Sequence, residues 1–295
     1  MRQSRRQWCV AACIVWLAIG SAGAAPAIQL KPTPAALEHV MLGRWVILLG
    51  ETHDNAVQQA LRISALRQFV ASGARPALAL EQFDLDRQAD IDRARRERPR
   101  DAAYLIDRAG ADPGWNWNYY RPFVELALQY DLPIVAANLS RNDAMRVAVE
   151  GWSALFDAET RDQLKLDRLP ADLHQKQLQA VRTGHCNLLP AGQEEPLARA
   201  QVARDIIMAR AIRPYLGTGV VLLAGNGHVR RDIGVPRWIP DDWRKNAISI
   251  GLLERNETPG PSQPNEEFDA YLMTDPAERT DPCAELAKRF HRPLR

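Results

Sequence analysis

The sequence predicts an α/β fold, with a mostly parallel sheet flanked by helices and a helical insertion that forms a small lobe. Short runs of aliphatic and β-branched residues alternate with longer segments of helical period, which is typical of parallel sheets with crossover helices. The runs are apolar throughout, as is usual for strands covered on both faces. We expect strands at residues 45–49, 77–80, 133–137, 220–224 and 247–253.

The first crossover is predicted to be a helix over residues 56–70. Its apolar residues recur at roughly helical spacing, and Asp54 or Asn55 can serve as the N-cap. Gly73 and Pro76 are suited to end this helix and to open the next strand.

Residues 141–216 interrupt the alternation with four helical stretches, at 143–156, 158–168, 172–183 and 195–213. We interpret residues 25–295 as one α/β domain that carries this segment as its helical insertion. Beyond the last expected strand, residues 254–264 indicate a turn or exposed loop, and 268–273 an edge strand. An amphipathic helix from Ala284 ends the chain.

Residues 1–24 have the features of a signal peptide. A basic start is followed by a short apolar stretch and by Ala22-Gly23-Ala24, a small-residue cleavage site. Cys13 precedes most of the apolar stretch, whereas a lipid-modified cysteine should follow it. We therefore expect a periplasmic or secreted protein without a lipid anchor.

Cleavage would remove three of the 38 Lys and Arg residues and none of the 36 Asp and Glu residues, which leaves a formal charge of −1. A near-neutral chain gives no electrostatic reason to expect binding to nucleic acid or to an anionic surface. Cys186 and Cys283 remain after cleavage and could pair in an oxidising compartment, but the sequence does not give the Cα separation that a disulfide requires.

Polar side chains directly follow four of the expected strands. Two of these strands end in Gly-x-x-His, and the residues concerned are Glu51, His53, Glu81, Asn138, Arg141, Asn226 and His228. Because the carboxyl ends of parallel strands share one crevice, we expect these side chains to lie at one rim of the sheet. Such a group suits a metal ion, a metal-bound cofactor or acid–base chemistry, whereas a single Gly-x-x-His could be a turn with a capping histidine.

Two further stretches are candidates for ligand contacts. The segment GWNWNYYRPF at 114–123 could form an aromatic wall for a planar ligand, with Tyr119 or Tyr120 offering an oxygen to iron, or could pack on the core as a hydrophobic flap. Helical geometry allows only one of the two tyrosines to face a pocket, and we select Tyr120, which lies on the same face as Trp117. Gln201, Asp205 and Met208 form a stripe on one face of the last inserted helix.

These motifs together resemble the ChaN-like haem-binding domain family. The resemblance spans about residues 35–255 and rests on Gly50-Glu-Thr-His-Asp-Asn55, Glu81, Trp115-x-Trp-x-x-Tyr120-x-Pro122, Ala136-Ala-Asn138 with Arg141, Gln201-x-x-x-Asp205-x-x-Met208 and Ala224-Gly-Asn-Gly-His228. It implies haem as the cofactor and a role in haem or iron acquisition. The aromatic loop and the lobe would contact the ring, and His53, His228 and Arg141 would pair with propionates or position an axial ligand. Transient contacts with envelope uptake proteins and a homodimer would be compatible with that role.

The same superfamily is similar to the Tiki/TraB proteins, and this similarity implies an alternative. In it, His53 and His228 bind a divalent metal together with Glu51 or Glu81, and the remaining carboxylate acts as the general base of a hydrolase. We favour a binding protein over an enzyme. The axial iron ligand and the physiological ligand remain open.

Overall fold

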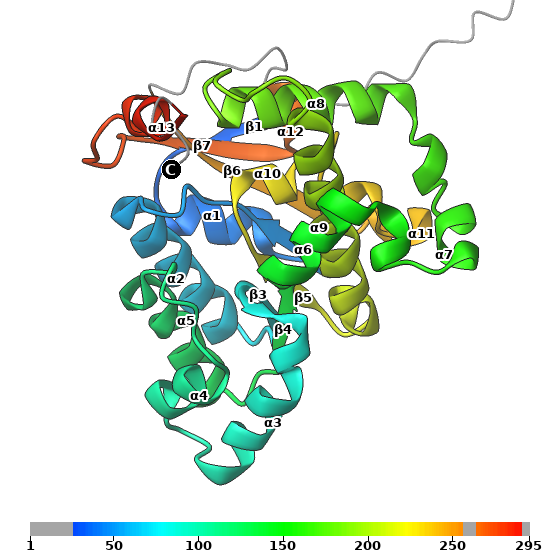
Figure 1. The fold of residues 1–295 in the computed structure, drawn as a ribbon. Helices are drawn as coiled ribbons and strands as arrows, with labels where there is room; N and C mark the ends of the chain where they lie inside the picture. Colours follow the sequence, from blue (N-terminus) through cyan, green and yellow to red (C-terminus); the bar gives the residue numbers. More distant parts are fainter. Residues whose placement is uncertain (1–25, 256–263, 291–295) are drawn as a thin grey trace, which may run out of the picture.

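The computed structural model describes residues 26–255 and 264–290, so the expected signal peptide and most of the expected turn at 254–264 lie outside the described residues. The described chain contains a seven-stranded, all-parallel sheet in the order β1-β7-β6-β2-β5-β3-β4 (Figure 1). The strands are β1 Ile28–Leu30, β2 Val46–Leu49, β3 Ala77–Asp84, β4 Ile134–Asn138, β5 Val220–Leu223, β6 Ala247–Glu254 and β7 Ala270–Thr274. The predicted parallel α/β fold is therefore confirmed.

One edge of the sheet differs from the prediction. The strand expected at 268–273 forms as β7, but it lies between β6 and β1 instead of at the edge. The three-residue β1 pairs with β7 and takes the edge position. A strand of only three residues, two of them exposed, shows too little alternation to be recognised in the sequence.

Helices cover both faces of the sheet (Figure 1). One face packs against α1 Pro34–Met41, α2 Ala56–Ala71, α3 Gln88–Glu97, α4 Ala102–Arg108 and α5 Trp117–Gln129. The other face packs against α9 Glu194–Ile212, η4 Arg213–Tyr215, α10 Asn226–Val229 and η5 Val235–Arg237. The predicted first crossover helix is confirmed as α2, and the Asn55 side chain caps it by accepting a hydrogen bond from Gln58 N. The remaining elements are η1 Leu85–Arg87, α11 Asp241–Arg244 and α12 Pro264–Glu267.

The insertion consists of α6 Arg141–Glu150, η2 Trp152–Ala154, α7 Ala158–Gln163, η3 Leu166–Arg168 and α8 Ala171–Gly184, followed by α9. The first two helical stretches expected from the sequence are each broken in two. The breaks fall at Gly151, with φ of 88°, and at Lys165, with φ of 53°. Both residues adopt left-handed backbone conformations, which end a right-handed helix.

A disulfide joins the insertion to the C-terminal helix α13 Pro282–Phe290. Cys186 follows α8 and Cys283 lies in α13, with a Cα–Cα distance of 5.6 Å. The bond that the sequence left open is therefore present, and it closes a loop across a sequence separation of 97 residues. It fastens the end of the chain to the insertion.

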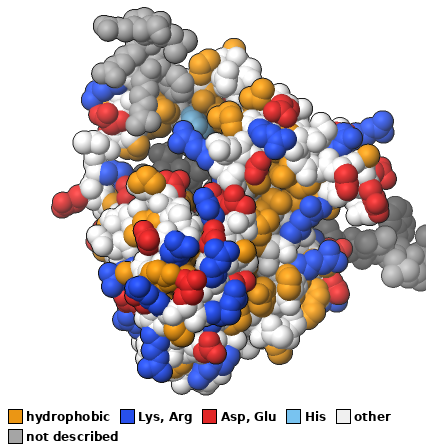
Figure 2. Space-filling model, turned by 60° about the horizontal axis from the view of Figure 1, so that its bottom comes forward, with side chains coloured by type: hydrophobic (Ala, Val, Ile, Leu, Met, Phe, Trp, Pro, Cys, Tyr) orange, Lys and Arg blue, Asp and Glu red, His pale blue; other side chains and the backbone are white. Residues whose placement is uncertain are grey.

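The surface carries charges of both signs. On the face shown in Figure 2, Lys and Arg side chains alternate with Asp and Glu side chains and with smaller apolar areas. Among the helices in the described part of the chain, none is both long and apolar enough to span a membrane.

Candidate functional site

Two glycines allow β2 and β5 to end side by side. Leu49 and Leu223, the last residues of these strands, are register partners. A Cβ on Gly50 would lie 2.3 Å from Asn226 Oδ1, and a Cβ on Gly225 would lie 2.8 Å from His53 Cε1. Neither position has room for a side chain without a shift of its neighbour. The close approach of the two strand ends thus accounts for the glycine in both Gly-x-x-His segments.

Asn226 connects three strand ends. Its side-chain amide donates to Leu252 O at 2.6 Å and accepts from Leu252 N at 3.0 Å, and its backbone N–H donates to Glu51 O at 2.9 Å. These bonds tie the chain after β5 to β6 and to the end of β2. Asn226 therefore has a structural role at the rim.

Glu51 is buried and lies at the centre of a hydrogen-bonded group on the α2 and α5 side of the sheet. Its carboxylate forms an ion pair with the buried Arg62 and accepts from Gln59 Nε2 at 2.5 Å. Tyr120 Oη donates to Glu51 Oε1 at 2.7 Å, and His53 Nδ1 lies 2.8 Å from the same oxygen. The carboxylate is thus compensated by one guanidinium and several donors.

Arg62 and Gln59 were not among the predicted site residues. Both lie on α2, where Arg62 is fully buried and also donates to Gln59 Oε1 and to Leu49 O. Burial lowers the pKa of Arg62 to about 10, and the guanidinium keeps its charge at neutral pH. An arginine within the buried face of a predicted helix was the signal that could have revealed it, because such a charge needs a partner.

A second group lies on the α9 side of the sheet. Glu81 is buried, and its Oε2 accepts from Gly225 N at 2.7 Å. His228 Nε2 lies 3.5 Å from Glu81 Oε1, and His228 Nδ1 lies 2.7 Å from Asp205 Oδ1. An imidazole is therefore held between two buried carboxylates. We refer to Glu51, His53, Glu81, Asp205 and His228 as the rim cluster.

The two carboxylates keep His228 protonated. Burial alone would lower the pKa of His228, but Glu81 and Asp205 together raise it to about 10. Burial alone would raise the pKa of Glu81, but His228, His53 and the Gly225 N–H hold it well below its usual range. Burial raises the pKa of Asp205 to about 6, and His228 only partly opposes this. At neutral pH, His228 is thus an imidazolium with both ring nitrogens engaged.

The rim cluster reaches solvent at His53, whose side chain is 47% exposed. Glu51 engages Nδ1, while Nε2 has no hydrogen-bond partner among the described residues. Trp115 packs edge-on against the imidazole, with the ring centroids 4.9 Å apart and an interplanar angle of 82°. His53 therefore offers an oriented, half-exposed imidazole beside an aromatic side chain, and Trp115 lies in the 114–123 segment that was expected to form an aromatic wall.

From the sequence we expected Tyr120 to face an open pocket. In the structure it does not. The Tyr120 side chain is only 1% exposed, and its hydroxyl donates to Glu51. Trp117 is partly buried and packs against Phe83, with centroids 5.1 Å apart. Tyr119 is the half-buried tyrosine. The Trp117 face of α5 packs toward the sheet, so Tyr120 lies among the rim residues with its hydroxyl already engaged by Glu51, and its contact with a ligand stays a prediction.

Asn138 and Arg141 also differ from the expectation. Asn138 is buried, and its Oδ1 accepts a hydrogen bond from Arg204. Arg141 begins α6 as an exposed residue, and no ion pair joins it to Glu51 or Glu81. Buried Arg62 neutralises Glu51 and His228 neutralises Glu81, so Arg141 takes no part in the rim, and its expected role toward a haem propionate stays a prediction.

The three residues of the predicted stripe on α9 have different surroundings: two line a cavity and one lies in the core. Gln201 and Asp205 line a cavity of about 180 Å³, together with His228 and residues of α8. Met208 is fully buried and packs against the sheet. Gln201 and Asp205 therefore lie beside the rim cluster, whereas Met208 has a packing role.

The sequence that carries this site matches the model of a known protein family. The family model described as "Haem-binding uptake, Tiki superfamily, ChaN" matches residues 39–239, about two thirds of the chain, and includes every member of the rim cluster. The chain belongs to the ChaN family.

One solved structure shows the same fold. The structure titled "Cofacial heme binding to ChaN of Campylobacter jejuni" has a TM-score of 0.62 and 21% sequence identity, and the match covers 83% of this chain and 97% of that one. An open conformation of an erythromycin esterase EreC mutant matches with a TM-score of 0.45 and 14% identity, over 78% of this chain and 76% of that one. No curated protein matches the sequence. The seven-stranded parallel sheet with its helical lobe is therefore a ChaN-type fold.

The four residues expected to bind a metal do not form a metal site in this ChaN-family chain. Within residues 26–255 and 264–290, no group of three or more His, Cys, Asp and Glu side chains is arranged to hold a metal ion. Of the four, Glu51 is paired with Arg62, and His228 has both ring nitrogens engaged by carboxylates. A metal ligand must present a free lone pair, and among the two histidines only His53 does so.

Proposed function

We propose that this protein binds haem at the rim cluster, with His53 as the side chain that faces the iron. The observation that carries the proposal is the state of His53: Nδ1 is held by a carboxylate, and Nε2 is free in a half-exposed imidazole. A metal-ligating histidine almost always has its other ring nitrogen fixed by such a partner. Membership of a haem-binding uptake family supports the same ligand.

The residues around His53 would then have distinct tasks. Glu51 fixes the imidazole orientation, while Arg62, Gln59 and Tyr120 hold Glu51 in place. Trp115 stands edge-on to the imidazole and would pack beside the porphyrin plane. When bound, haem would supply an iron that His53 Nε2 could ligate. The residues present therefore fit the group.

The biological setting we propose is haem or iron acquisition outside the cytoplasm. The expected signal peptide and the Cys186–Cys283 disulfide support export, since disulfides persist mainly in oxidising compartments. Transfer of haem would require transient contact with envelope uptake proteins. A half-exposed binding residue supports such transfer, because the ligand would be accessible at the protein surface.

Titration of the mature protein with hemin tests the proposal. We expect a saturable change in the Soret band, which His53→Ala should abolish or shift strongly. His39→Ala is the matched control, because His39 is exposed at the end of α1, away from the strand ends. Wild-type protein without saturable binding, or equal spectra for the wild type and His53→Ala, would refute the assignment.

The metal-dependent hydrolase implied by the Tiki/TraB similarity is the alternative, and it would require His228 to give up its contacts with Asp205 and Glu81 before a ring nitrogen could bind an ion. It requires a stoichiometric divalent ion that depends on His53 and His228. Elemental analysis of protein purified without chelator, compared with a His53→Ala/His228→Ala variant, distinguishes the two functions. The haem proposal expects metal-free protein that still binds hemin.

A further inference from the structure

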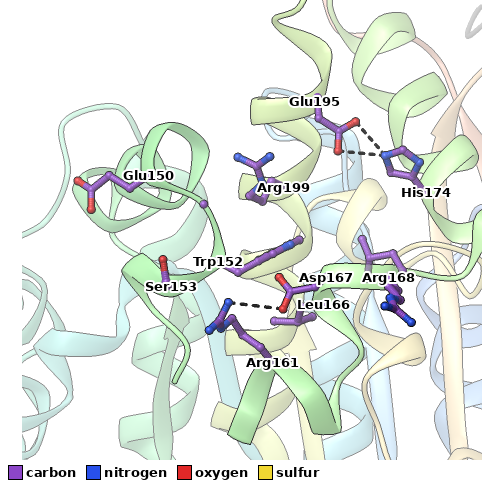
Figure 3. Close-up of a pocket in the computed structure, with 12 residues that line it drawn as sticks. Glu150, Trp152, Ser153, Arg161, Leu166, Asp167, Arg168, His174, Glu195 and Arg199 are labelled. Atoms are coloured by element: carbon purple, nitrogen blue, oxygen red, sulfur yellow. Dashed lines mark hydrogen bonds and ion pairs between the residues drawn. The ribbon is translucent and has the colours of Figure 1, made fainter. Parts of the chain in front are cut away.

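A cavity of about 590 Å³ lies within the helical lobe, and none of its lining residues belongs to the rim cluster (Figure 3). The walls come from the end of α6, from η2, α7 and η3, and from one side chain of α8 and two of α9. Small-molecule sites usually have volumes of about 300–1,000 Å³. The cavity therefore has the size of a binding site, and nothing in the proposed haem site accounts for it.

Trp152 provides a flat apolar surface inside this cavity. Figure 3 shows its indole between Arg199 on one side and the Arg161–Asp167 pair on the other. The Arg199 guanidinium lies over the indole, 6.0 Å from the ring centroid. Leu166 and Leu169 add apolar lining. A planar ring could stack on this surface at little cost, since stacked aromatic pairs are favourable beyond the area that they bury.

The carboxylates of the cavity already have cationic partners. Glu195 lies 2.8 Å from His174 Nε2, and Asp167 lies 3.4 Å from Arg161 Nη1. Glu150 lies 3.8 Å from Arg146 Nε. Each negative charge of the lining is therefore offset within the protein.

The cations are not all matched in this way. Among the described residues, no carboxylate lies within ion-pair distance of Arg168 or Arg199, and the Arg199 guanidinium donates only to a backbone oxygen, Ala148 O, at 3.0 Å. In addition, Arg161 Nε is buried and has no hydrogen-bond partner. The cavity thus contains positive charge that no carboxylate of the described residues offsets.

We propose that the lobe cavity binds a small aromatic carboxylate. Its ring would stack on Trp152, and its carboxylate would be held by Arg168, whose planar fork matches carboxylate geometry. The carboxylate would offset the charge of Arg168. This site is separate from the proposed haem site and does not depend on it.

Calorimetric titration of the mature protein with 2-naphthoate tests this proposal, with 2-naphthylmethanol as the uncharged comparison. We expect saturable 1:1 binding of 2-naphthoate only. Arg168→Gln should weaken it about tenfold, as expected for the loss of one charge-assisted contact. Arg44→Gln is the matched control, because Arg44 is an exposed arginine before β2 and does not line the cavity.

Further measurements separate the two sites and control for folding. Arg168 is exposed at the end of η3, so Arg168→Gln should retain the wild-type circular dichroism and hemin titration. Arg168→Lys, which keeps the charge but loses the fork, should bind 2-naphthoate with intermediate affinity. The proposal is overturned by no saturable binding, by equal affinity in the wild type and Arg168→Gln, or by an equal loss in Arg44→Gln. Displacement of 2-naphthoate by hemin would also overturn it, because the cavity would then belong to the haem site.

Discussion

At the residue scale, the two buried carboxylates of the rim differ in what neutralises them. Glu51 is paired with a fully buried arginine, whereas Glu81 is paired with a histidine that can lose its proton. The first pair is permanent across the ordinary pH range, since a guanidinium remains charged. The second pair depends on pH.

Glu51→Ala should lower the free energy of unfolding by about 3–5 kcal/mol, because it leaves Arg62 buried without its carboxylate. Replacing both partners by apolar residues, as in Glu51→Leu/Arg62→Met, should recover much of that loss. Urea unfolding measures both effects. Glu125→Ala breaks the exposed Arg121–Glu125 pair and should cost no more than about 1 kcal/mol. Equal losses for Glu51→Ala and Glu125→Ala would contradict the buried pairing.

His228 makes stability depend on pH. Its pKa is raised from 6.5 to about 10 in the folded protein, so its stabilisation is complete below pH 6.5 and is lost as the pH rises toward 10. The folded state then holds a proton that the unfolded state has released. We expect the free energy of unfolding to fall with a slope of at most about 1.4 kcal/mol per pH unit in this window. In urea unfolding between pH 6.5 and 9.5, His228→Gln should flatten the slope; an unchanged slope would disprove the linkage.

At the scale of the elements, the rim depends on how closely β2 and β5 end. The added Cβ of Gly50→Ala would meet Asn226 Oδ1 and, at 2.9 Å, the backbone oxygen of Ile250. The Cβ of Gly225→Ala would instead meet the half-exposed His53 ring. A backbone atom yields less readily than the end of an exposed side chain.

We therefore expect Gly50→Ala to destabilise the fold and Gly225→Ala chiefly to displace His53. Overpacking at the first site should lower the free energy of unfolding by about 1–3 kcal/mol. Gly225→Ala should unfold closer to the wild type but bind hemin more weakly if His53 faces the iron. Thermal unfolding and hemin titration of both variants provide the comparison. If Gly225→Ala binds hemin with wild-type affinity, His53 does not contribute to hemin binding.

At the scale of the whole molecule, the Cys186–Cys283 bond joins the lobe to the C-terminal helix, which is otherwise largely exposed. Removing it by Cys186→Ser/Cys283→Ser should lower the free energy of unfolding by about 2–5 kcal/mol, because the unfolded chain regains the freedom of a long loop. Thermal unfolding with and without dithiothreitol measures this. The wild type should lose stability in the reductant, and the double variant should not. An unfolding temperature of the wild type that the reductant leaves unchanged would contradict the prediction.

The parallel α/β fold, the helical insertion and the identity of the rim carboxylates and histidines follow from signals in the sequence alone. Apolar runs of strand length and glycines at strand ends are local signals, and the edge shared by parallel strands then brings Glu51, His53, Glu81 and His228 together. The partners of these side chains, in contrast, depend on tertiary packing. Arg62 approaches Glu51 from a helix, Asp205 approaches His228 from the lobe, and Tyr120 turns inward while Trp115 stands beside His53. These choices depend on which helix face packs against the sheet. Packing is a long-range property, and the spacing of residues within one segment does not encode it.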